Sequence, residues 1–201
     1  FSVTQPIPAI TTIAPTTAEV AVTNTWSYDE APTAPVVREQ VRFVVHRATE
    51  QGRAIDFDLT FTNAHDSDVT FLGAKDKGYG GFCLRPDAAR KPFTFTSAQG
   101  VSPEDVLRCE TPWADVSWSA GPAGPASGAA IFEHPGNPGY PFPGWMFRHY
   151  GFLGASWPHE QPYTLKPGES FRLRYRLYLH RGSAADANIG ETFRAYEREN
   201  R

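Results

Sequence analysis

A loop rich in proline and glycine carries most of the unusual chemistry of this sequence. Residues 133–145 read EHPGNPGYPFPGW, and FRHYG follows at 147–151. Each proline fixes φ and removes a backbone donor, which excludes a helix or a central strand there. His134 precedes a proline, so its backbone is held extended and its imidazole has a restricted direction. A rigid loop that carries histidine, asparagine and tryptophan, with an arginine close behind, is a candidate site.

His134 is the candidate acid or base of this loop. An imidazole next to a carboxylate is a common way to bring a pKa near neutrality. Adjacent residues on an extended backbone face opposite sides, however, so we expect the Glu133 side chain to point away from His134. The alternative role for His134 is structural, with its ring bonded to a backbone carbonyl of the loop.

Two arginines stand in segments that otherwise read as apolar or aromatic strands. A guanidinium in such a place is costly unless it is paired, so Arg85 and Arg148 each need a partner. Asp87 or Asp115 could supply one within the protein. Alternatively, the planar fork of Arg148 could hold a substrate carboxylate or a pair of vicinal hydroxyls.

Aromatic residues gather in the same segments, and these are Trp113, Trp118, Tyr140, Trp145 and Tyr150. Their rings could stack on sugar rings, or they could be core residues. Trp145 is the one that we expect to be exposed, because it lies in the proline-rich loop. Lys77, in the run KDKGYGG, is either a solvated turn residue or a basic site group, since the glycines let the backbone approach a ligand closely.

Two segments have the alternation of a half-buried strand. Apolar residues alternate with polar ones at 55–62 and again at 171–180, where three arginines lie on the polar side. The shorter strand candidates are Val20 to Thr23, Val41 to His46, Val69 to Leu72, Gly81 to Arg85, Phe93 to Thr96, Asp115 to Trp118, Ala129 to Phe132 and Met146 to Phe152. Turns rich in proline, glycine and aspartate separate them. The pattern predicts an all-β fold, an antiparallel β-sandwich.

Helical periodicity is confined to the C-terminal end. Ile189, Phe193 and Tyr196 fall at i, i+4 and i+7, with Ser183 or Asp186 as the N-cap. We therefore expect one peripheral C-terminal helix that packs on the outside of the sheets.

The composition bounds the class of protein. A chain of 201 residues can bury a sizeable core, and we expect an extended lead-in at 1–18 and a single β-sandwich domain at 19–201. A net charge of -3 gives no electrostatic footprint for nucleic acid, and no apolar run is long enough for a membrane span. The six histidines show no metal-ligand spacing, so neither a metal nor a cofactor is expected.

The two cysteines have two interpretations. Cys83 and Cys109 lie in neighbouring strand candidates, so we expect them to come close enough to form a disulfide in an oxidising compartment. The alternative is a pair of buried thiols that act as small apolar residues. A bridge would indicate an exported protein, periplasmic or extracellular, which is the location we expect.

Five segments carry a resemblance to a known family. They are KGYGGFCLR (77–85), WADVSW (113–118), GAAIFEHPGNP (128–138), FRHYGF (147–152) and LKPGESFRLRYRLYLHRG (165–182). In these segments the chain resembles a family of β-rich bacterial proteins often labelled methane oxygenase PmoA, with HPxNP and RxYG as the most specific motifs. Typical members are longer at the N-terminus and carry a His-rich stretch there. The chain is therefore expected to be the C-terminal part of a longer domain, with only part of the family's site.

The resemblance implies a β-sandwich similar to the mutarotase-like supersandwich of carbohydrate-active proteins. Methane oxidation is not expected, because a membrane methane oxygenase needs hydrophobic spans and a metal centre with several histidine or carboxylate ligands. We expect instead a carbohydrate-active protein, a glycan hydrolase, lyase or isomerase, with its site in the concave face beside the HPGNP loop. The alternative is a non-catalytic glycan-binding or structural module.

The expected site brings the chemical groups above into one pocket. His134 and Arg148 are the catalytic candidates. The candidates for binding the carbohydrate are Lys77, Arg85, Trp113, Asn137, Trp145 and Tyr150. The HPGNP loop and the FRHYG strand should form one wall of this pocket, because a rigid loop places side chains accurately and an arginine within an apolar strand demands a partner.

Overall fold

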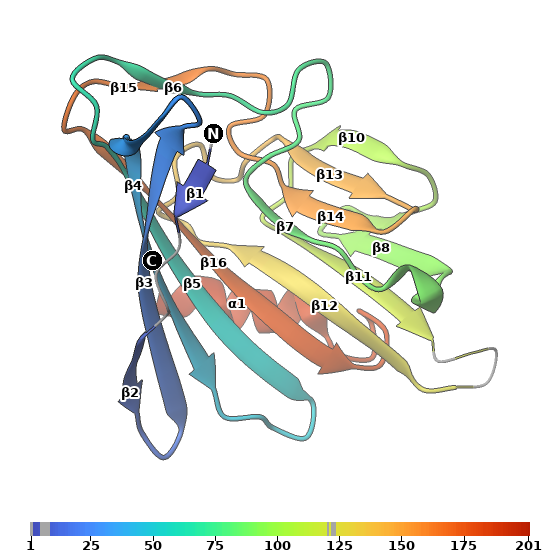
Figure 1. The fold of residues 1–201 in the computed structure, drawn as a ribbon. Coiled ribbons are helices and arrows are strands. Elements are labelled where there is room, and N and C mark those ends of the chain that lie inside the picture. The colour runs from blue at the N-terminus through green and yellow to red at the C-terminus, as the bar shows by residue number, and fades with distance from the viewer. Residues whose placement is uncertain (1, 5–8, 120, 122–123) are drawn as a thin grey trace.

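The computed structural model describes all residues except 1, 5–8, 120 and 122–123. A large curved sheet carries smaller sheets on its concave side and one helix behind it (Figure 1). The strands are β1 (Ser2–Thr4), β2 (Ala9–Ile13), β3 (Thr17–Tyr28), β4 (Ala31–His46), β5 (Gly52–Asn63), β6 (Val69–Phe71), β7 (Phe82–Leu84), β8 (Phe93–Ser97), β9 (Gly100–Ser102), β10 (Val106–Cys109), β11 (Trp113–Ser119), β12 (Ala126–Glu133), β13 (Trp145–Arg148), β14 (Phe152–Ala155), β15 (Tyr163–Leu165) and β16 (Ser170–Arg181). The helices are a short 3-10 turn, Ala88–Arg90, and α1, Ile189–Glu199.

Ten of the described strands form the large sheet. Their order is β1-β3-β4-β5-β16-β12-β11-β8-β9, with β2 also paired to β3. All of these neighbours pair antiparallel. A four-stranded sheet has the order β10-β13-β14-β7, and β15 pairs with β6. The antiparallel all-β sandwich predicted from the alternation is confirmed.

The two strands with the clearest alternation, β5 and β16, lie side by side in the large sheet. Phe61 stands opposite Phe171, and their rings stack with centroids 4.9 Å apart. On the other face the Arg176 guanidinium donates two hydrogen bonds to the Asp56 carboxylate. The period of two thus decides which side chains reach the core and which form the charged convex surface.

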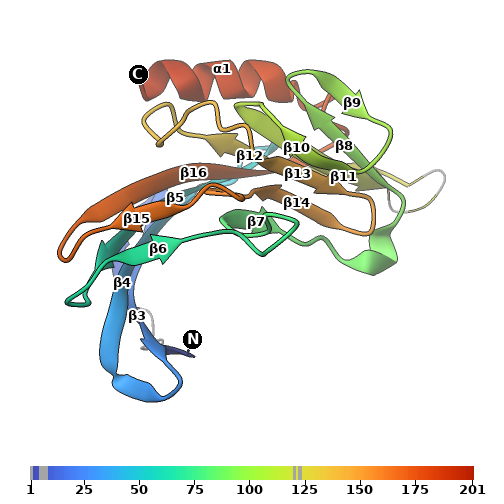
Figure 2. The same cartoon turned by 90° about the horizontal axis from the view of Figure 1, so that it is seen from above.

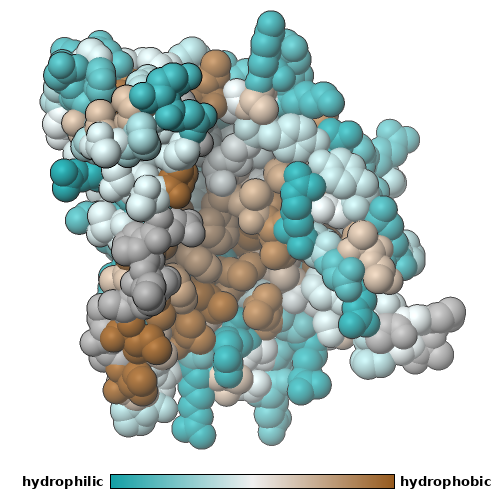
Figure 3. Space-filling view, viewed as in Figure 1, coloured by the Kyte–Doolittle hydropathy of each residue, from teal (hydrophilic) through white to brown (hydrophobic). Residues whose placement is uncertain are grey.

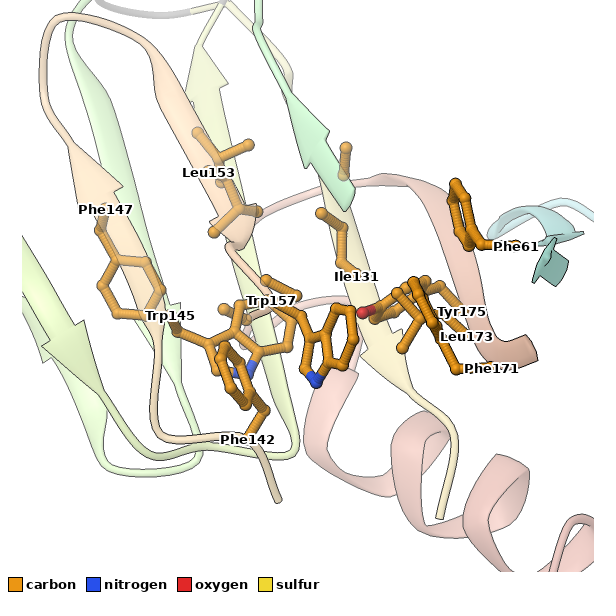
Figure 4. Close-up of a cluster of buried hydrophobic side chains, with 14 of the residues drawn as sticks. Phe61, Ile131, Phe142, Trp145, Phe147, Leu153, Trp157, Phe171, Leu173 and Tyr175 are labelled. Carbon is orange, nitrogen blue, oxygen red and sulfur yellow. The ribbon is translucent and has the colours of Figure 1, made fainter. Parts of the chain in front are cut away.

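The main core lies between the large sheet and the four-stranded sheet. Phe147 and Leu153 are fully buried there, and the Phe95 ring stacks on Phe147 with centroids 6.0 Å apart. Figure 4 shows the same cluster extending to Trp157 and Phe171, whose ring centroids are 4.5 Å apart. Burial of each such ring stabilises the fold by about 1.5–3 kcal/mol.

Helix α1 covers the face of the large sheet that is turned away from the four-stranded sheet (Figure 2). Its Ile189, Phe193 and Tyr196 are buried, as their spacing predicted. They pack with Phe132 of β12 and Trp113 of β11 in a second apolar cluster. The single peripheral C-terminal helix is confirmed.

The N-cap of α1 is not either of the two predicted residues. Asn188 occupies this position in the left-handed conformation and makes no capping bond with its side chain. Ser183 and Asp186 bond to each other instead, since the Asp186 carboxylate accepts hydrogen bonds from the Ser183 amide and hydroxyl. These two residues close the turn before the helix, which is why they are not free to cap it.

The strand limits differ from the sequence expectation in two places. Within the expected lead-in, β1 and β2 pair with β3 and so belong to the large sheet. The expected strand from Met146 to Phe152 is two strands, β13 and β14, paired with each other. Gly151, with φ of 112°, allows the tight turn between them.

Cys83 and Cys109 lie on opposite edges of the four-stranded sheet. Cys83 is in β7 and Cys109 is in β10, with β13 and β14 between them. Three strand spacings of about 4.8 Å place them roughly 14 Å apart, which is beyond the ~7 Å reach of a disulfide. Both cysteines are free, so the predicted bridge is wrong.

The concave side of the large sheet is hollowed and apolar over β4, β5 and β16 (Figure 3). Phe43, Ile55, Phe57 and Leu177 are only partly buried there, and Leu179 is 39% exposed. The rings of Phe43 and Phe57 stack across β4 and β5. This part of the concave face offers apolar surface rather than the polar groups expected of the site.

Candidate functional site

The loop at residues 134–144 connects β12 to β13 and is anchored by Asn137. The Asn137 amide donates to the Arg174 carbonyl at 2.9 Å and accepts from the Arg174 amide at 2.8 Å. These two bonds continue the hydrogen-bond ladder of β16 into the loop, with a side chain in place of a strand. Asn137 is 5% exposed. Its contacts hold the loop and do not face an open surface.

Replacing Asn137 by alanine should lower the free energy of unfolding by about 2 kcal/mol, because two backbone groups lose their hydrogen-bond partner. Urea unfolding of the variant and the wild type measures this difference. The Gln161→Ala variant is the control, since Gln161 is exposed and its loss should change stability by less than about 0.5 kcal/mol. If the free energy of unfolding of Asn137→Ala equals that of the wild type, other contacts hold the loop in place.

Glu133 points into the core beneath this loop and away from His134, as expected. It is 1% exposed, and its Oε2 accepts a hydrogen bond from the Phe142 amide at 2.9 Å. Burial raises the pKa of Glu133 to about 8, and the bond from Phe142 only partly opposes this. Glu133 therefore carries a proton at neutral pH and belongs to the packing of the loop.

A groove of about 570 Å³ lies beside the loop. Its walls are residues 138–143 of the loop and residues 157–158 and 161–163 of the segment that leads into β15, with Glu110 at one side. Trp157 and Tyr163 form an aromatic wall, with ring centroids 4.9 Å apart. Trp157 and Phe142, both drawn in Figure 4, connect the groove to the buried core. The segments that form the groove are therefore anchored in the hydrophobic core.

The polar groups of the groove lie at its rim. Glu110 and Gln161 are exposed there, while the Tyr140 hydroxyl donates to Glu197 of α1 at 2.8 Å. Such a groove can hold a flat, partly apolar ring and make hydrogen bonds to its hydroxyls. Among the described residues that line it, Glu110 is the one carboxylate. Glycoside hydrolysis usually needs two.

A second polar cluster lies at one end of the four-stranded sheet, in Arg148 of β13 and in residues just outside its strands. We call it the arginine–tyrosine cluster (Tyr79, Arg85, Asp105, Arg148 and Tyr150). Arg148 donates to Asp105 at 2.8 Å and to the Tyr79 hydroxyl at 2.7 Å. The hydroxyls of Tyr79 and Tyr150 are 3.1 Å apart. The Arg85 guanidinium lies 5.8 Å from the centroid of the Tyr150 ring. The segments at 77–85 and 147–152 therefore meet here.

The partner of Arg148 is Asp105 and not Asp87 or Asp115. Hydrogen bonds from the His149 backbone, and then from Arg148, lower the pKa of Asp105 to about 2. Asp105 is thus a fixed anion and a poor proton acceptor at neutral pH. The cluster offers the exposed ring of Tyr150 and the guanidinium groups of Arg85 and Arg148. The charge of Arg148 is already neutralised by Asp105.

His134 and Arg148 lie on opposite faces of the large sheet. The His134 ring is edge-on to Tyr196 of α1, with centroids 6.2 Å apart. Helix α1 covers the convex face, whereas the strand of Arg148 belongs to the sheet on the concave side (Figure 2). The common pocket expected for His134 and Arg148 is therefore not formed.

The remaining predicted residues fall into two groups. Trp145 is fully buried and Trp113 is 8% exposed, so both are core residues. The expectation that Trp145 is exposed is wrong, because β13 begins at this residue and its alternation turns the indole into the sandwich. Lys77 is exposed in the turn that leads to Tyr79. The structure thus brings Arg85, Arg148 and Tyr150 together, with Lys77 two residues from the cluster.

Sequence reasoning missed the wall of the groove formed by Trp157 and Tyr163. The segment SWPHEQPY, residues 156–163, has the same mixture of proline and aromatic residues as the HPGNP loop, and that composition was the available signal. Asp105 was also missed. It stands in a short turn, SPED, where no local pattern distinguishes it from a solvated acid.

The described residues form neither a metal site nor a membrane-spanning helix. Among them, no group of three or more histidine, cysteine, aspartate or glutamate side chains is placed to hold a metal ion. In the same part of the chain, no helix has the length and apolar character needed to cross a membrane.

Comparison with known proteins places the chain in a family. The profile of DUF6807, a family of unknown function, matches residues 7–194. The chain belongs to this family. No curated protein matches the sequence. Membership in DUF6807 covers the loop, the groove and the arginine–tyrosine cluster, but it assigns no chemistry to them.

Among solved structures, one match is a crystal structure from Klebsiella pneumoniae whose description names an aldose 1-epimerase. The two chains are 12% identical, with a TM-score of 0.41, and the match covers 92% of this DUF6807 chain and 56% of the other. The chain thus spans little more than half the length of that protein. A likeness of this degree carries no argument about activity, so the function has to be argued from the site.

Proposed function

We propose that this DUF6807 protein is a carbohydrate-active protein that binds a glycan in the groove beside the HPGNP loop. The observation that carries the proposal is the aromatic wall of Trp157 and Tyr163, which lines a groove of about 570 Å³ together with the prolines of the loop. This volume lies within the range of roughly 300–1,000 Å³ that is usual for small-ligand sites.

The chemistry of the groove suits a sugar. One face of a pyranose is apolar and stacks on an aromatic ring, while its hydroxyls need hydrogen-bond partners at the edge. Tyr163, which is half-buried, supplies the accessible ring, and Trp157, 6% exposed, packs behind it. Glu110 and Gln161 supply polar groups at the rim. The loop prolines keep the wall rigid, so little conformational entropy is lost on binding.

Binding is the activity that the groove supports best, and turnover is an extension of it. Hydrolysis, elimination or isomerisation of a glycan needs an acid and a base at the reacting atoms. The described lining offers Glu110, and Glu133 lies buried beneath the loop. The methane oxygenase label of similar sequences has no part in this proposal, which rests on the groove alone.

Calorimetric titration with a panel of neutral and acidic oligosaccharides tests the proposal. We expect one class of glycan to bind the wild type with a saturable heat of binding. The double variant Glu110→Ala/Gln161→Ala should bind it about tenfold more weakly or worse, because each lost hydrogen bond contributes about 1 kcal/mol. Its melting temperature should stay close to that of the wild type, since both side chains are exposed.

The matched control is Glu50→Ala/Gln51→Ala, which removes the same residue types from an exposed turn outside the groove. It should bind the glycan like the wild type. Formation of a new saccharide product would identify an enzyme, and binding without product would identify a glycan-binding module. If no glycan of the panel binds, or if the groove variant binds as well as the control, the proposal is wrong.

A further inference from the structure

Three arginines lie on the convex side of β16, and one of them lacks a partner. Arg172 forms a two-point ion pair with Asp58, and Arg176 forms another with Asp56. Arg174 lies between them. Its guanidinium makes no hydrogen bond and no ion pair with any described residue, although its backbone is bonded to Asn137. The convex surface therefore carries one half-buried cation that the fold itself does not neutralise.

The Arg174 guanidinium faces a small pocket of about 210 Å³ beside the C-terminal end of α1. The lining of this pocket includes His134, Arg172, Tyr196 and Asn200. Gly136 makes room for the guanidinium, because a Cβ at this position would lie 2.4 Å from Arg174 Nη2. The HPGNP loop thus leaves space for the cation and supplies a histidine next to it.

The charge of this pocket is not balanced by its own acids. Asp56 and Asp58 line the pocket. Both oxygens of Asp58 are bonded to Arg172, and Asp56 is bonded to Arg176 and His46. Burial, and then the positive charge of Arg172, lowers the pKa of Arg174. Burial, and then the charge of Arg174, lowers the pKa of His134 to about 4. Burial alone lowers the pKa of a cation, and the neighbouring arginine charges act in the same direction.

His134 can act as a neutral donor in this pocket. Its Nδ1 accepts a hydrogen bond from the Gly136 amide at 2.9 Å. The proton of the neutral ring is therefore on Nε2, the nitrogen on the far side of the ring from that bond. The Arg174 guanidinium is a donor without an acceptor among the described residues, which an anion can supply. The His134 ring has the Asn200 side chain as its hydrogen-bond partner, and an anion can exchange with that partner.

We propose that the pocket of Arg174, His134 and Asn200 is a binding site for a small oxyanion group, a carboxylate or a phosphate. The planar fork of Arg174 would take two oxygens of this group, and the Nε2–H of His134 would exchange the Asn200 side chain for a third contact. The site is separate from the groove, because it lies on the helix-covered face and shares no lining residue with it. Failure of glycan binding in the groove would leave this proposal untouched.

Titration with inorganic phosphate and with D-glucuronate, at constant ionic strength in chloride, tests the site. The imidazole resonances of His134 provide a local readout by NMR. We expect a saturable shift with at least one of the two probes. A response to phosphate alone would identify a tetrahedral oxyanion, and a response to glucuronate alone a carboxylate. The Arg174→Met variant should bind about tenfold more weakly or worse, since the fork is lost.

The control is Arg198→Met, which removes an exposed arginine of α1 and should leave binding unchanged. Arg174→Met should fold normally, because no described hydrogen bond depends on the guanidinium. If it does not fold, Gly136→Ala is the second variant, since the added Cβ occupies the place of the guanidinium. Absence of a saturable response in the wild type, or an equal response in the variants that lack or displace the guanidinium, would overturn the proposal.

Discussion

Replacing Asp115 by alanine should lower the free energy of unfolding by about 3–5 kcal/mol, the cost of breaking a buried polar pair by removing one partner. Asp115 Oδ2 and His180 Nε2 are 2.7 Å apart, and both side chains are completely buried. The other carboxylate oxygen accepts from the Ser117 hydroxyl at 2.9 Å. The alanine variant would leave both partners in the protein interior without their acceptor.

The pair reaches across a strand, which explains why no local substitute is available. Asp115 is on β11 and His180 is on β16, with β12 between them. Gly128 of β12 leaves the gap, because a Cβ there would lie 2.5 Å from the His180 ring. Chemical unfolding monitored by tryptophan fluorescence measures the loss.

An exposed ion pair serves as the control for Asp115→Ala. Glu191 and Arg194 of α1 have side chains that are 59% and 61% exposed. Glu191→Ala should cost about 0.5 kcal/mol, since surface pairs contribute little. If Asp115→Ala costs no more than Glu191→Ala, the buried pair does not stabilise the sheet and the expectation fails.

The Glu133→Gln variant should remove a pH dependence that the wild type shows. Folding raises the pKa of Glu133 from 4.5 to about 8, so the folded state favours the protonated acid. The contribution of Glu133 to the free energy of unfolding is fully present below pH 4.5, and it is lost as the pH rises through 8. Within that window the free energy of unfolding falls by about 1.4 kcal/mol per pH unit.

The measurement is the difference in free energy of unfolding between Glu133→Gln and the wild type at pH 5 and at pH 7. It should shift by about 2 kcal/mol in favour of the variant, because glutamine stays neutral and still offers an oxygen to the Phe142 amide. The control is Glu110→Gln, at the exposed rim of the groove. Its free energy of unfolding should match that of the wild type at both pH values. If the free energy of unfolding changes equally between pH 5 and pH 7 in Glu133→Gln and in the wild type, Glu133 is not held in the protonated form.

The parts of the fold that could be predicted are those that depend on a residue's neighbours in the sequence. The alternation in β5 and β16 indicated two strands with one apolar face, and the spacing of Ile189, Phe193 and Tyr196 indicated the helix. The positions of Cys83 and Cys109 could not be predicted in this way. Their separation depends on the strand order β10-β13-β14-β7, which no local pattern specifies.

The candidate site shows the same division. The proline-rich loop was recognisable, and so was the need of Arg148 for a partner. The partner, Asp105, is 43 residues away in sequence and was not recognisable. His134 and Arg148 were expected together because both stand in distinctive motifs, but the loop between them passes from the convex face of one sheet to another sheet. A distinctive sequence motif does not indicate on which face of a sheet its side chains will lie.

The position of β16 constrains how the chain can fold during synthesis. It is the last described strand, yet it lies between β5 and β12 in the middle of the large sheet. Until residues 170–181 leave the ribosome, the nascent chain holds two groups of strands, each with an open edge and part of an apolar face. The ion pair of Arg172 with Asp58 then closes a separation of 114 residues. Such long-range pairing is slow, so the open edges of both groups stay exposed to aggregation until β16 pairs with β5 and β12.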